Sequence, residues 1–96
     1  MGLLTGKTAI VTGAARGIGK AIAMKFAAEG ANIAFTDLVI DENGQNTEKE
    51  IAALGVKVKG YASNAASFED TAKVVEQIHA DFGSVDILVN NAGITK

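Results

Sequence analysis

The strongest constraint on the fold is an alternation of segments along the chain. Short apolar, strand-like runs alternate with helix-like segments, and each helix-like segment ends at a glycine that a strand-like run follows (Gly30, Gly55 and Gly83). A glycine in left-handed backbone commonly ends a helix. Repeated strand–helix–strand units require right-handed crossovers and a parallel sheet. The sequence therefore predicts an α/β fold.

The boundaries of these segments follow from the same pattern. The predicted strands cover residues 8–11, 32–36, 56–62 and 85–89. The predicted helices cover residues 18–29, 41–54 and 68–82, the last with Ser67 as N-cap and Asp70 three residues later as a weak capping box. Alternating Val and Lys over residues 56–59 indicates an edge strand or one wet face. We expect the order 3-2-1-4, which is half of a doubly wound sheet with helices on both faces.

Apolar spacing predicts which helix faces are buried. In the first helix Ile18, Ile22 and Phe26 recur every four residues and predict the buried stripe. The stripe predicted for the third helix consists of Phe68, Ala72, Val75 and Phe82, widened by Val74 and Ile78. The fourth strand is expected to leave an open apolar edge, which favours association.

Composition excludes several classes of function. The 96 residues suit one small domain, and a content of 48% hydrophobic residues suits a sheet covered on both faces. No apolar run approaches the ~20 residues that span a bilayer, and the N-terminus lacks the features of a secretory signal, so we expect a cytoplasmic protein without membrane attachment. The absence of cysteine excludes disulfides and thiolate metal sites. A net charge of −2 without a basic stripe argues against nucleic-acid binding.

A glycine-rich loop lies between the first predicted strand and helix. Residues 12–19 read TGAARGIG, which places glycines at positions 13, 17 and 19. Glycine permits unusual φ angles and close approach of a ligand to the backbone, and the free N–H groups of the following helix attract anions. A turn that merely joins strand to helix is the alternative, but the position of the loop predicts a pyrophosphate site and hence dinucleotide binding.

Asp37 strengthens this prediction because it ends the second predicted strand, roughly 20 residues beyond the loop, where a carboxylate meets the adenosine ribose. A turn residue or helix cap is the alternative role for such an Asp. The carboxylate would repel a 2′-phosphate, since two unit charges 4 Å apart interact by about 4 kcal/mol at an effective dielectric of 20. Leu38 supplies no compensating cation, although Arg16 could offset part of the repulsion. NAD is therefore favoured over NADP.

Two motifs together carry a family resemblance. Thr12-Gly13-x-x-x-Gly17-x-Gly19 and the sequence Asn-Asn-Ala-Gly at positions 90–93 resemble the short-chain dehydrogenase/reductase family over essentially the whole chain. Within the family, Asn64 and the terminal motif are most similar to bacterial 3-oxoacyl-acyl-carrier-protein reductases. The resemblance implies a Rossmann-type fold, NAD or NADP as cofactor, and reduction of an acyl thioester on acyl carrier protein in fatty-acid biosynthesis. It also implies a homo-oligomer, commonly a homotetramer.

The resemblance also implies a set of cofactor-binding positions. Asn64 and the Ala65 N–H would meet the adenine edge, whereas Asn90 would border the ribose and the path to the nicotinamide. Asn90 and Asn91 also have a structural interpretation, in which their amides satisfy neighbouring backbone groups at the strand end. The full predicted set is Gly13, Ala15, Arg16, Gly17, Ile18, Gly19, Asp37, Leu38, Asn64, Ala65, Asn90, Ala92 and Gly93.

No catalytic or metal-binding residue is predicted in the chain. Tyr61 has Ala65 where the family's Tyr-x-x-x-Lys motif requires lysine, and His79 lies among charged residues typical of a solvated helix face. The family's catalytic residues follow the Asn-Asn-Ala-Gly motif, so residues 1–96 are expected to be a dinucleotide-binding half-domain that is inactive alone, without the catalytic C-terminal half. The alternatives are a nucleotide-binding module without chemistry, a piece that only completes another protein's sheet, and a dehydrogenase of a sugar, steroid or other small alcohol.

Overall fold

A four-stranded parallel sheet with the strand order β3-β2-β1-β4 forms the centre of the molecule. The computed structural model describes residues 2–15, 17–64 and 67–91. The strands are β1 (Thr8–Thr12), β2 (Asn32–Asp37), β3 (Val58–Ala62) and β4 (Ile87–Val89). The predicted parallel sheet and its order are confirmed, although β3 and β4 each begin two residues later than expected.

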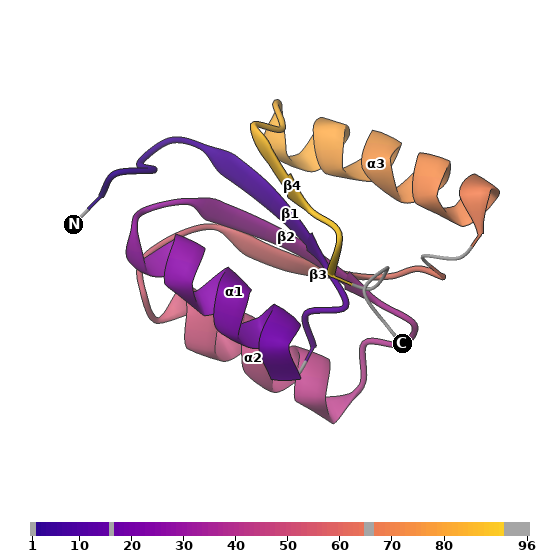
Figure 1. The fold of residues 1–96 in the computed structure, drawn as a ribbon, viewed down its shortest axis with the longest axis horizontal. Coiled ribbons are helices and arrows are strands. Elements are labelled where there is room, and N and C mark those ends of the chain that lie inside the picture. Colours follow the sequence, from indigo (N-terminus) through magenta and orange to yellow (C-terminus); the bar gives the residue numbers. More distant parts are fainter. Residues whose placement is uncertain (1, 16, 65–66, 92–96) are drawn as a thin grey trace.

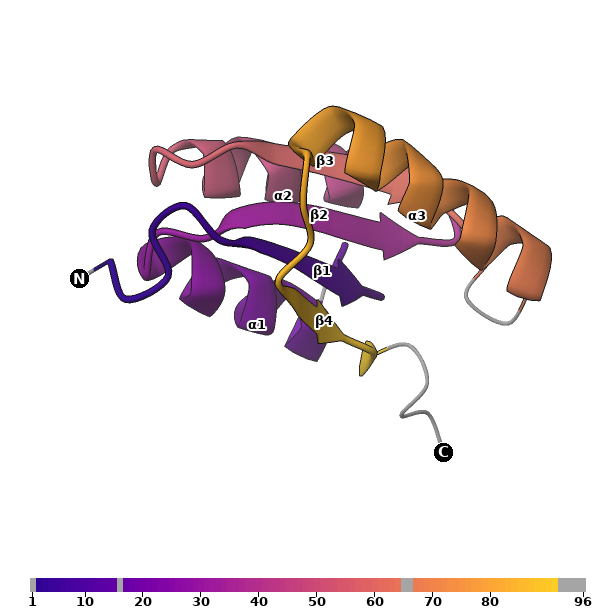
Figure 2. The ribbon, with the colours of Figure 1, turned by 90° about the horizontal axis from the view of Figure 1, so that it is seen from above.

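Helices cover both faces of this sheet, as predicted. The helices are α1 (Gly17–Ala28), α2 (Glu42–Ala52) and α3 (Phe68–Phe82). Figures 1 and 2 show α1 and α2 on one face and α3 on the other. The first face packs around Val11, Ile33, Phe35 and Ile51, and the second around Ile10, Ala34, Tyr61, Val74 and Ile78. Burial on both faces explains the apolar composition of the central strands.

The helix ends agree with the sequence signals. Asp41 caps α2 by accepting hydrogen bonds from the N–H groups of Asn43 and Gly44. Ser67 caps α3 by accepting a 3.2 Å bond from the Asp70 N–H, while the Asp70 carboxylate accepts from the Asn64 N–H instead of completing a capping box. Three glycines, at positions 30, 55 and 83, have φ between 90° and 97° after the helices, as expected for residues that follow helix ends, although α2 ends at Ala52, two residues before the predicted end at residue 54.

The buried face of α1 differs from the prediction. Gly19, Ala23 and Ala27 face the sheet, whereas Ile18 is 74% exposed and Ile22 and Phe26 are only half-buried. Small side chains allow the helix backbone to lie close to the sheet, so the helix turns its narrowest side inward. The stripe of large apolar residues is therefore displaced toward the surface.

The buried face of α3 also differs. Val74 and Ile78 are the buried residues, with Val75 and Phe82 partly buried beside them. Phe68 and Ala72, which were expected on the buried stripe, are exposed, Phe68 to 88%. Phe68 is the first residue of α3, whereas the residues of α3 that pack on the sheet lie farther along the helix. The residues expected only to widen the stripe are its centre.

Two kinds of feature are absent from residues 2–15, 17–64 and 67–91. None of the helices there is both long and apolar enough to cross a membrane. Among the same residues, no group of three or more His, Asp or Glu side chains is placed to hold a metal ion.

Candidate functional site

The glycine-rich loop lies at the carboxyl ends of the strands, where it turns from β1 into α1. Gly13 and Gly17 both have positive φ, 66° and 67°, which L side chains rarely adopt. The N–H groups of Gly13 and Ala14 donate to the Thr36 carbonyl at 2.7 and 3.1 Å. These bonds bend the loop over the end of β2. The two positive-φ glycines therefore allow the tight reversal that the sequence predicts.

Gly19 is required for a different reason, which is close approach. A Cβ atom at this position would lie 2.1 Å from the Gly13 carbonyl oxygen and 2.7 Å from Asn91 Nδ2. The first turn of α1 therefore lies directly against the loop and the residues after β4. Any side chain here would push the helix N-terminus away from the loop.

Asp37 lies at the end of β2 and connects this strand to the loop. Its Oδ2 accepts a 3.1 Å hydrogen bond from the Ala15 N–H, and its Oδ1 accepts a 2.9 Å bond from the Leu38 N–H. An ionised carboxylate has about four acceptor positions, so each oxygen retains capacity for a further donor. The side chain is thus held in place beside the loop and can still accept hydrogen bonds from sugar hydroxyls.

Thr47, on α2, is a member of this site that the sequence analysis missed. Its side chain is fully buried, and its hydroxyl donates a 2.7 Å hydrogen bond to the Ala15 carbonyl. The signal in the sequence was a hydroxyl residue on the inner face of α2, between Gly44 and Ile51. The partner could not be read from the sequence, because the two residues are far apart along the chain.

The two asparagines after β4 have the structural role that was expected as one of their uses. The Thr12 hydroxyl donates to Asn90 Oδ1 at 3.1 Å, and Asn91 Nδ2 donates to the Gly13 carbonyl at 3.2 Å. They therefore tie the residues after β4 to the end of β1 and to the loop. Their side chains contact the same loop that Asp37 and Thr47 contact.

The remaining predicted positions are dispersed. Ile18 and Leu38 are exposed, Leu38 to 66%, at the starts of the segments that follow β1 and β2. Asn64 is exposed beyond the end of β3, and its carbonyl accepts from the Ser67 N–H at 2.9 Å. Four predicted positions lie outside the described residues: Arg16, Ala65, Ala92 and Gly93.

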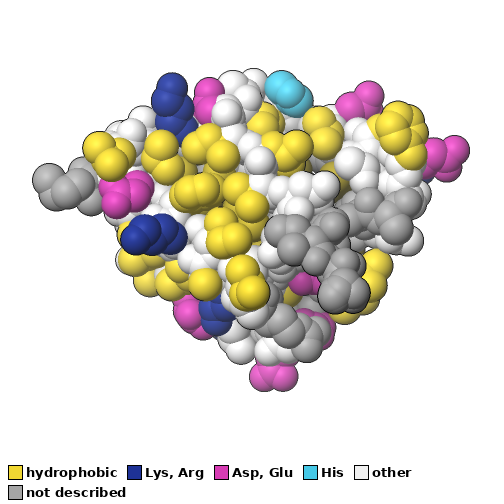
Figure 3. All heavy atoms as spheres, in the orientation of Figure 1, with side chains coloured by type: hydrophobic (Ala, Val, Ile, Leu, Met, Phe, Trp, Pro, Cys, Tyr) yellow, Lys and Arg dark blue, Asp and Glu magenta, His cyan; other side chains and the backbone are white. Residues whose placement is uncertain are grey.

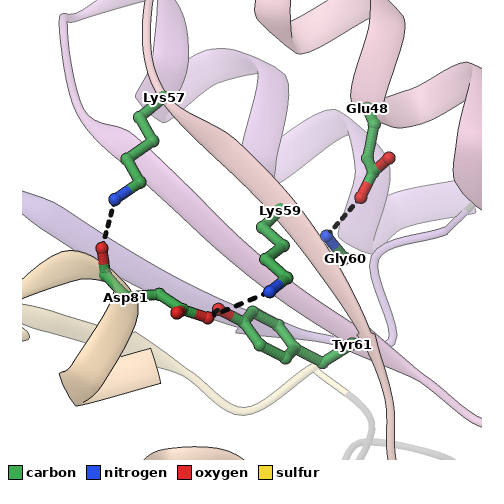
Figure 4. A network of polar contacts seen from close by, with 6 residues as sticks. All are labelled: Glu48, Lys57, Lys59, Gly60, Tyr61 and Asp81. Atoms are coloured by element: carbon green, nitrogen blue, oxygen red, sulfur yellow. Dashed lines mark hydrogen bonds and ion pairs between the residues drawn. The ribbon is translucent and has the colours of Figure 1, made fainter. Parts of the chain in front are cut away.

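Tyr61 is not suited to acid–base catalysis. Figure 4 shows Tyr61 and Lys59, both from β3, converging on the Asp81 carboxylate of α3. The Tyr61 hydroxyl donates to Asp81 Oδ2 at 2.6 Å, and the Lys59 ammonium lies 3.1 Å from the same oxygen. Burial raises the pKa of the Tyr61 phenol, and the hydrogen bond to Asp81 raises it further. A general base near neutral pH needs the opposite shift.

The neighbours of Asp81 in this network also affect its carboxyl group and its backbone. The hydrogen bonds from Tyr61 and Lys59 lower the pKa of the Asp81 carboxyl. Lys57 donates to the Asp81 backbone carbonyl (Figure 4). His79 is exposed on α3, in agreement with the prediction of a surface histidine.

The chain matches a known protein family over most of its length. The sequence profile of the family described as short chain dehydrogenase matches residues 7–96. The chain is 48% identical over 91 residues to the 3-oxoacyl-acyl-carrier-protein reductase of Escherichia coli, covering 95% of this chain and 36% of that protein. It is also 42% identical to a short chain dehydrogenase from Burkholderia cenocepacia in complex with NADP, with a TM-score of 0.90 and coverage of 97% and 38%.

A second solved structure carries the other nicotinamide cofactor. A short chain dehydrogenase from Mycobacterium paratuberculosis bound to NAD is 32% identical, with a TM-score of 0.87 and coverage of 96% of this chain and 38% of that one. The chain thus spans little more than a third of the length of these relatives. On the family match, the sequence identities and the shared fold, the chain belongs to the short chain dehydrogenase family.

Proposed function

We propose that this chain forms the NAD(P)-binding portion of a reductase that converts a 3-oxoacyl thioester to the 3-hydroxyacyl form in fatty-acid biosynthesis. The observation that carries the proposal is the junction of loop, helix and carboxylate: Asp37 holds the Ala15 N–H beside the N-terminus of α1. The identity to 3-oxoacyl-acyl-carrier-protein reductases supports the choice of substrate class.

The loop and the start of α1 would hold the diphosphate. The first N–H groups of a helix have no acceptor within their own helix and carry partial positive charge. In α1 these groups belong to Gly17, Ile18 and Gly19. Among the described residues, apart from the chain neighbours and the helix backbone, no atom lies within 4 Å of the Cβ position at Gly17, so the backbone there is open to a ligand. This open backbone beside the loop fits a diphosphate.

Asp37 would bind the adenosine ribose and favour NAD over NADP. The spare acceptor capacity of its carboxylate suits the two ribose hydroxyls. A 2′-phosphate would place a second negative charge beside a carboxylate that is held in place by the Ala15 and Leu38 N–H groups. The bound cofactor would supply a hydride for the carbonyl carbon of the substrate.

The residues that exchange the proton are proposed to lie in a catalytic C-terminal half. Tyr61 is buried and bonded to Asp81, and His79 lies on the exposed face of α3. The family resemblance extends the proposal to an acyl-carrier-protein partner, a homotetramer and a cytoplasmic location.

Reduction of an acetoacetyl thioester by the intact protein tests the proposal. We expect NADH oxidation that depends on the thioester, monitored by the loss of NADH absorbance. Sugar, steroid and simple alcohol substrates assayed with NAD are the comparison set. Turnover of one of these but not of the thioester would contradict the substrate class. Dinucleotide binding without any turnover would instead favour a binding module.

The choice of cofactor has its own test. We expect Asp37→Ala to shift the ratio of kcat/KM for NADPH over NADH by at least about tenfold, which corresponds to about 1.4 kcal/mol. Asp86→Ala is a matched control, because Asp86 binds the Thr8 N–H at the opposite end of β1. A strong preference of the unmodified protein for NADPH would contradict the role given to Asp37.

A further inference from the structure

Ala15 is held on both sides by elements that come from different parts of the chain. Its N–H donates to Asp37 at the end of β2, and its carbonyl accepts from Thr47 in α2. Ala15 itself is 3% exposed. The middle of the glycine-rich loop is therefore buried, and the two bonds restrain the N–H and the carbonyl of Ala15, which belong to successive peptide groups.

The Thr47 hydroxyl has a strong physical reason to keep this bond. Thr47 is fully buried on the inner face of α2, between Gly44 and Ile51. A buried hydroxyl without a partner is unfavourable, because it has lost its hydrogen bonds to water. Any displacement of the loop that breaks the 2.7 Å bond to Ala15 is therefore opposed.

The restrained peptide lies at the position that matters for an anion. The Ala15 carbonyl belongs to the peptide that joins residues 15 and 16, immediately before α1 begins at Gly17. The bond from Thr47 to the Ala15 carbonyl therefore restrains the chain just before the first turn of α1. A binding site that is held in its bound geometry loses less entropy when the ligand binds.

We propose that Thr47 is a positioning residue for dinucleotide binding: through the Ala15 carbonyl it holds the glycine-rich loop and the start of α1 in the geometry that receives the diphosphate. This inference rests on the proposed function, since it assigns Thr47 a part in the same site. Thr47 acts through Ala15, whereas Asp37 both holds the loop and would contact the ribose.

Affinity for the dinucleotide in three variants of the intact protein tests the inference. Thr47→Val removes the hydroxyl and keeps the shape of the side chain, whereas Thr47→Ser keeps the hydroxyl. Thr8→Val is the control, because it removes the hydroxyl of another buried residue, at the far end of β1. We expect Thr47→Val to raise the Kd for NADH by about 3- to 10-fold. Thr47→Ser and Thr8→Val should stay within about twofold of the unmodified protein. In turnover, Thr47→Val should raise the KM for the dinucleotide and leave kcat at saturation unchanged.

A second measurement does not need the ligand. In unliganded protein, hydrogen exchange at the amides of Ala15 and Gly17–Gly19 should be faster in Thr47→Val than in Thr8→Val. If Thr47→Val fails to fold, the pair Thr47→Ser and Thr47→Ala, which differ only by one hydroxyl, replaces it. The expected result is then weaker NADH binding in the alanine variant alone.

The outcomes separate the two claims. Unchanged NADH affinity in a folded Thr47→Val variant, with normal binding by the unmodified protein, overturns the role of Thr47 and leaves the proposed function intact. Absence of binding of either dinucleotide by the unmodified protein overturns the proposed function, and Thr47 then only holds a loop. An equal loss of affinity in Thr8→Val also overturns the inference, because the effect would be one of general stability.

Discussion

The two outer strands of the described sheet, β3 and β4, present very different edges. Lys59 on β3 and Lys57 just before it are exposed, and the Glu48 carboxylate accepts a 2.6 Å hydrogen bond from the Gly60 N–H. Figure 4 shows this contact on one side of β3 and the Asp81 network on the other. Lysines and covered backbone groups are devices that prevent another strand from pairing with an edge.

On β4, by contrast, the most exposed residue is apolar. β4 has three residues, and its central residue, Leu88, is 66% exposed. Leu88 pairs with Ile10, so it lies on the face of the sheet that α3 covers elsewhere. On the other face, the outer side of α1 has a shallow apolar hollow of about 420 Å³, lined by Ile18, Ala21, Ile22, Lys25 and Phe26. Figure 3 shows hydrophobic side chains gathered on the surface of the molecule.

The difference indicates that the β3 edge is a solvent-facing surface, whereas the β4 edge is suited to contact with other protein. Contiguous exposed apolar residues commonly mark an interaction surface. The large residues of α1 that the apolar spacing placed in the core line the shallow hollow on the outer side of this helix. The spacing correctly predicted an apolar face of the helix, but it did not show whether that face packs in the core or lies at the surface.

The largest expected effect comes from disrupting the β3 edge at Gly60. A Cβ atom there would lie 2.7 Å from Phe35 Cζ and 3.2 Å from Glu48 Oε2. Since Phe35 is fully buried, we expect Gly60→Val to lower the free energy of unfolding by about 2 kcal/mol. Urea denaturation measures this loss. Ala62→Val, at an exposed position on the same face of the same strand, is the control, and an equal loss there would show that the Phe35 contact is not the cause.

A charge on β4 should sharpen the comparison by changing association. We expect Leu88→Lys to weaken self-association of the 96-residue chain about tenfold or more, because burial of a leucine contributes ~1.5–3 kcal/mol. Sedimentation velocity over a range of concentrations measures the effect. Phe68→Lys alters an even more exposed apolar residue on α3. Equal effects of the two substitutions would show that association does not depend on β4.

The smallest of these effects is expected from Tyr61→Phe, which removes the hydrogen bond to Asp81. We expect the free energy of unfolding at pH 7 to fall by about 1 kcal/mol. The reason for a modest value is that the Asp81 carboxylate can be rehydrated and keeps its contact with Lys59. No change in stability would mean that the hydrogen bond between Tyr61 and Asp81 contributes no more than the hydrogen bonds to water that replace it.

Tyr61→Phe should also change how stability depends on pH. The pKa of Tyr61 is raised in the folded state, so its contribution is fully present below the unfolded pKa of about 10 and is lost as pH rises through the folded pKa. The pKa of Asp81 is lowered, so its contribution is present above the unfolded pKa of about 3.9 and is lost as pH falls through the folded pKa. Denaturation from neutral to alkaline pH should therefore show a smaller loss of stability in the variant than in the unmodified protein.

Much of the fold was predictable because its signals are local. The glycines after the helices, the cap Ser67 and the alternation of segments lie within a few residues of the structure that they determine. The handedness of crossovers then leaves few arrangements of a parallel sheet. The loop and Asp37 were likewise predicted as one site from their spacing along the chain, and the family resemblance added Asn90.

The missed features depend on contacts between distant residues. Which side of α1 faces the sheet was decided by Gly19, Ala23 and Ala27, since close packing selects the small residues. The bond from Thr47 to Ala15 joins two residues that no local pattern connects. The same holds for the bond between Tyr61 and Asp81, which raises the pKa of the tyrosine.

The sequence by itself determined the order of elements, the parallel sheet and the place of the glycine-rich loop, because turn chemistry and apolar periodicity act over short distances. Only the tertiary structure decided which apolar residues are buried and which polar atoms meet. The reason is that burial and hydrogen bonding depend on the packing of one element against another, so Thr47 and Leu88 acquire their surroundings only in the folded molecule.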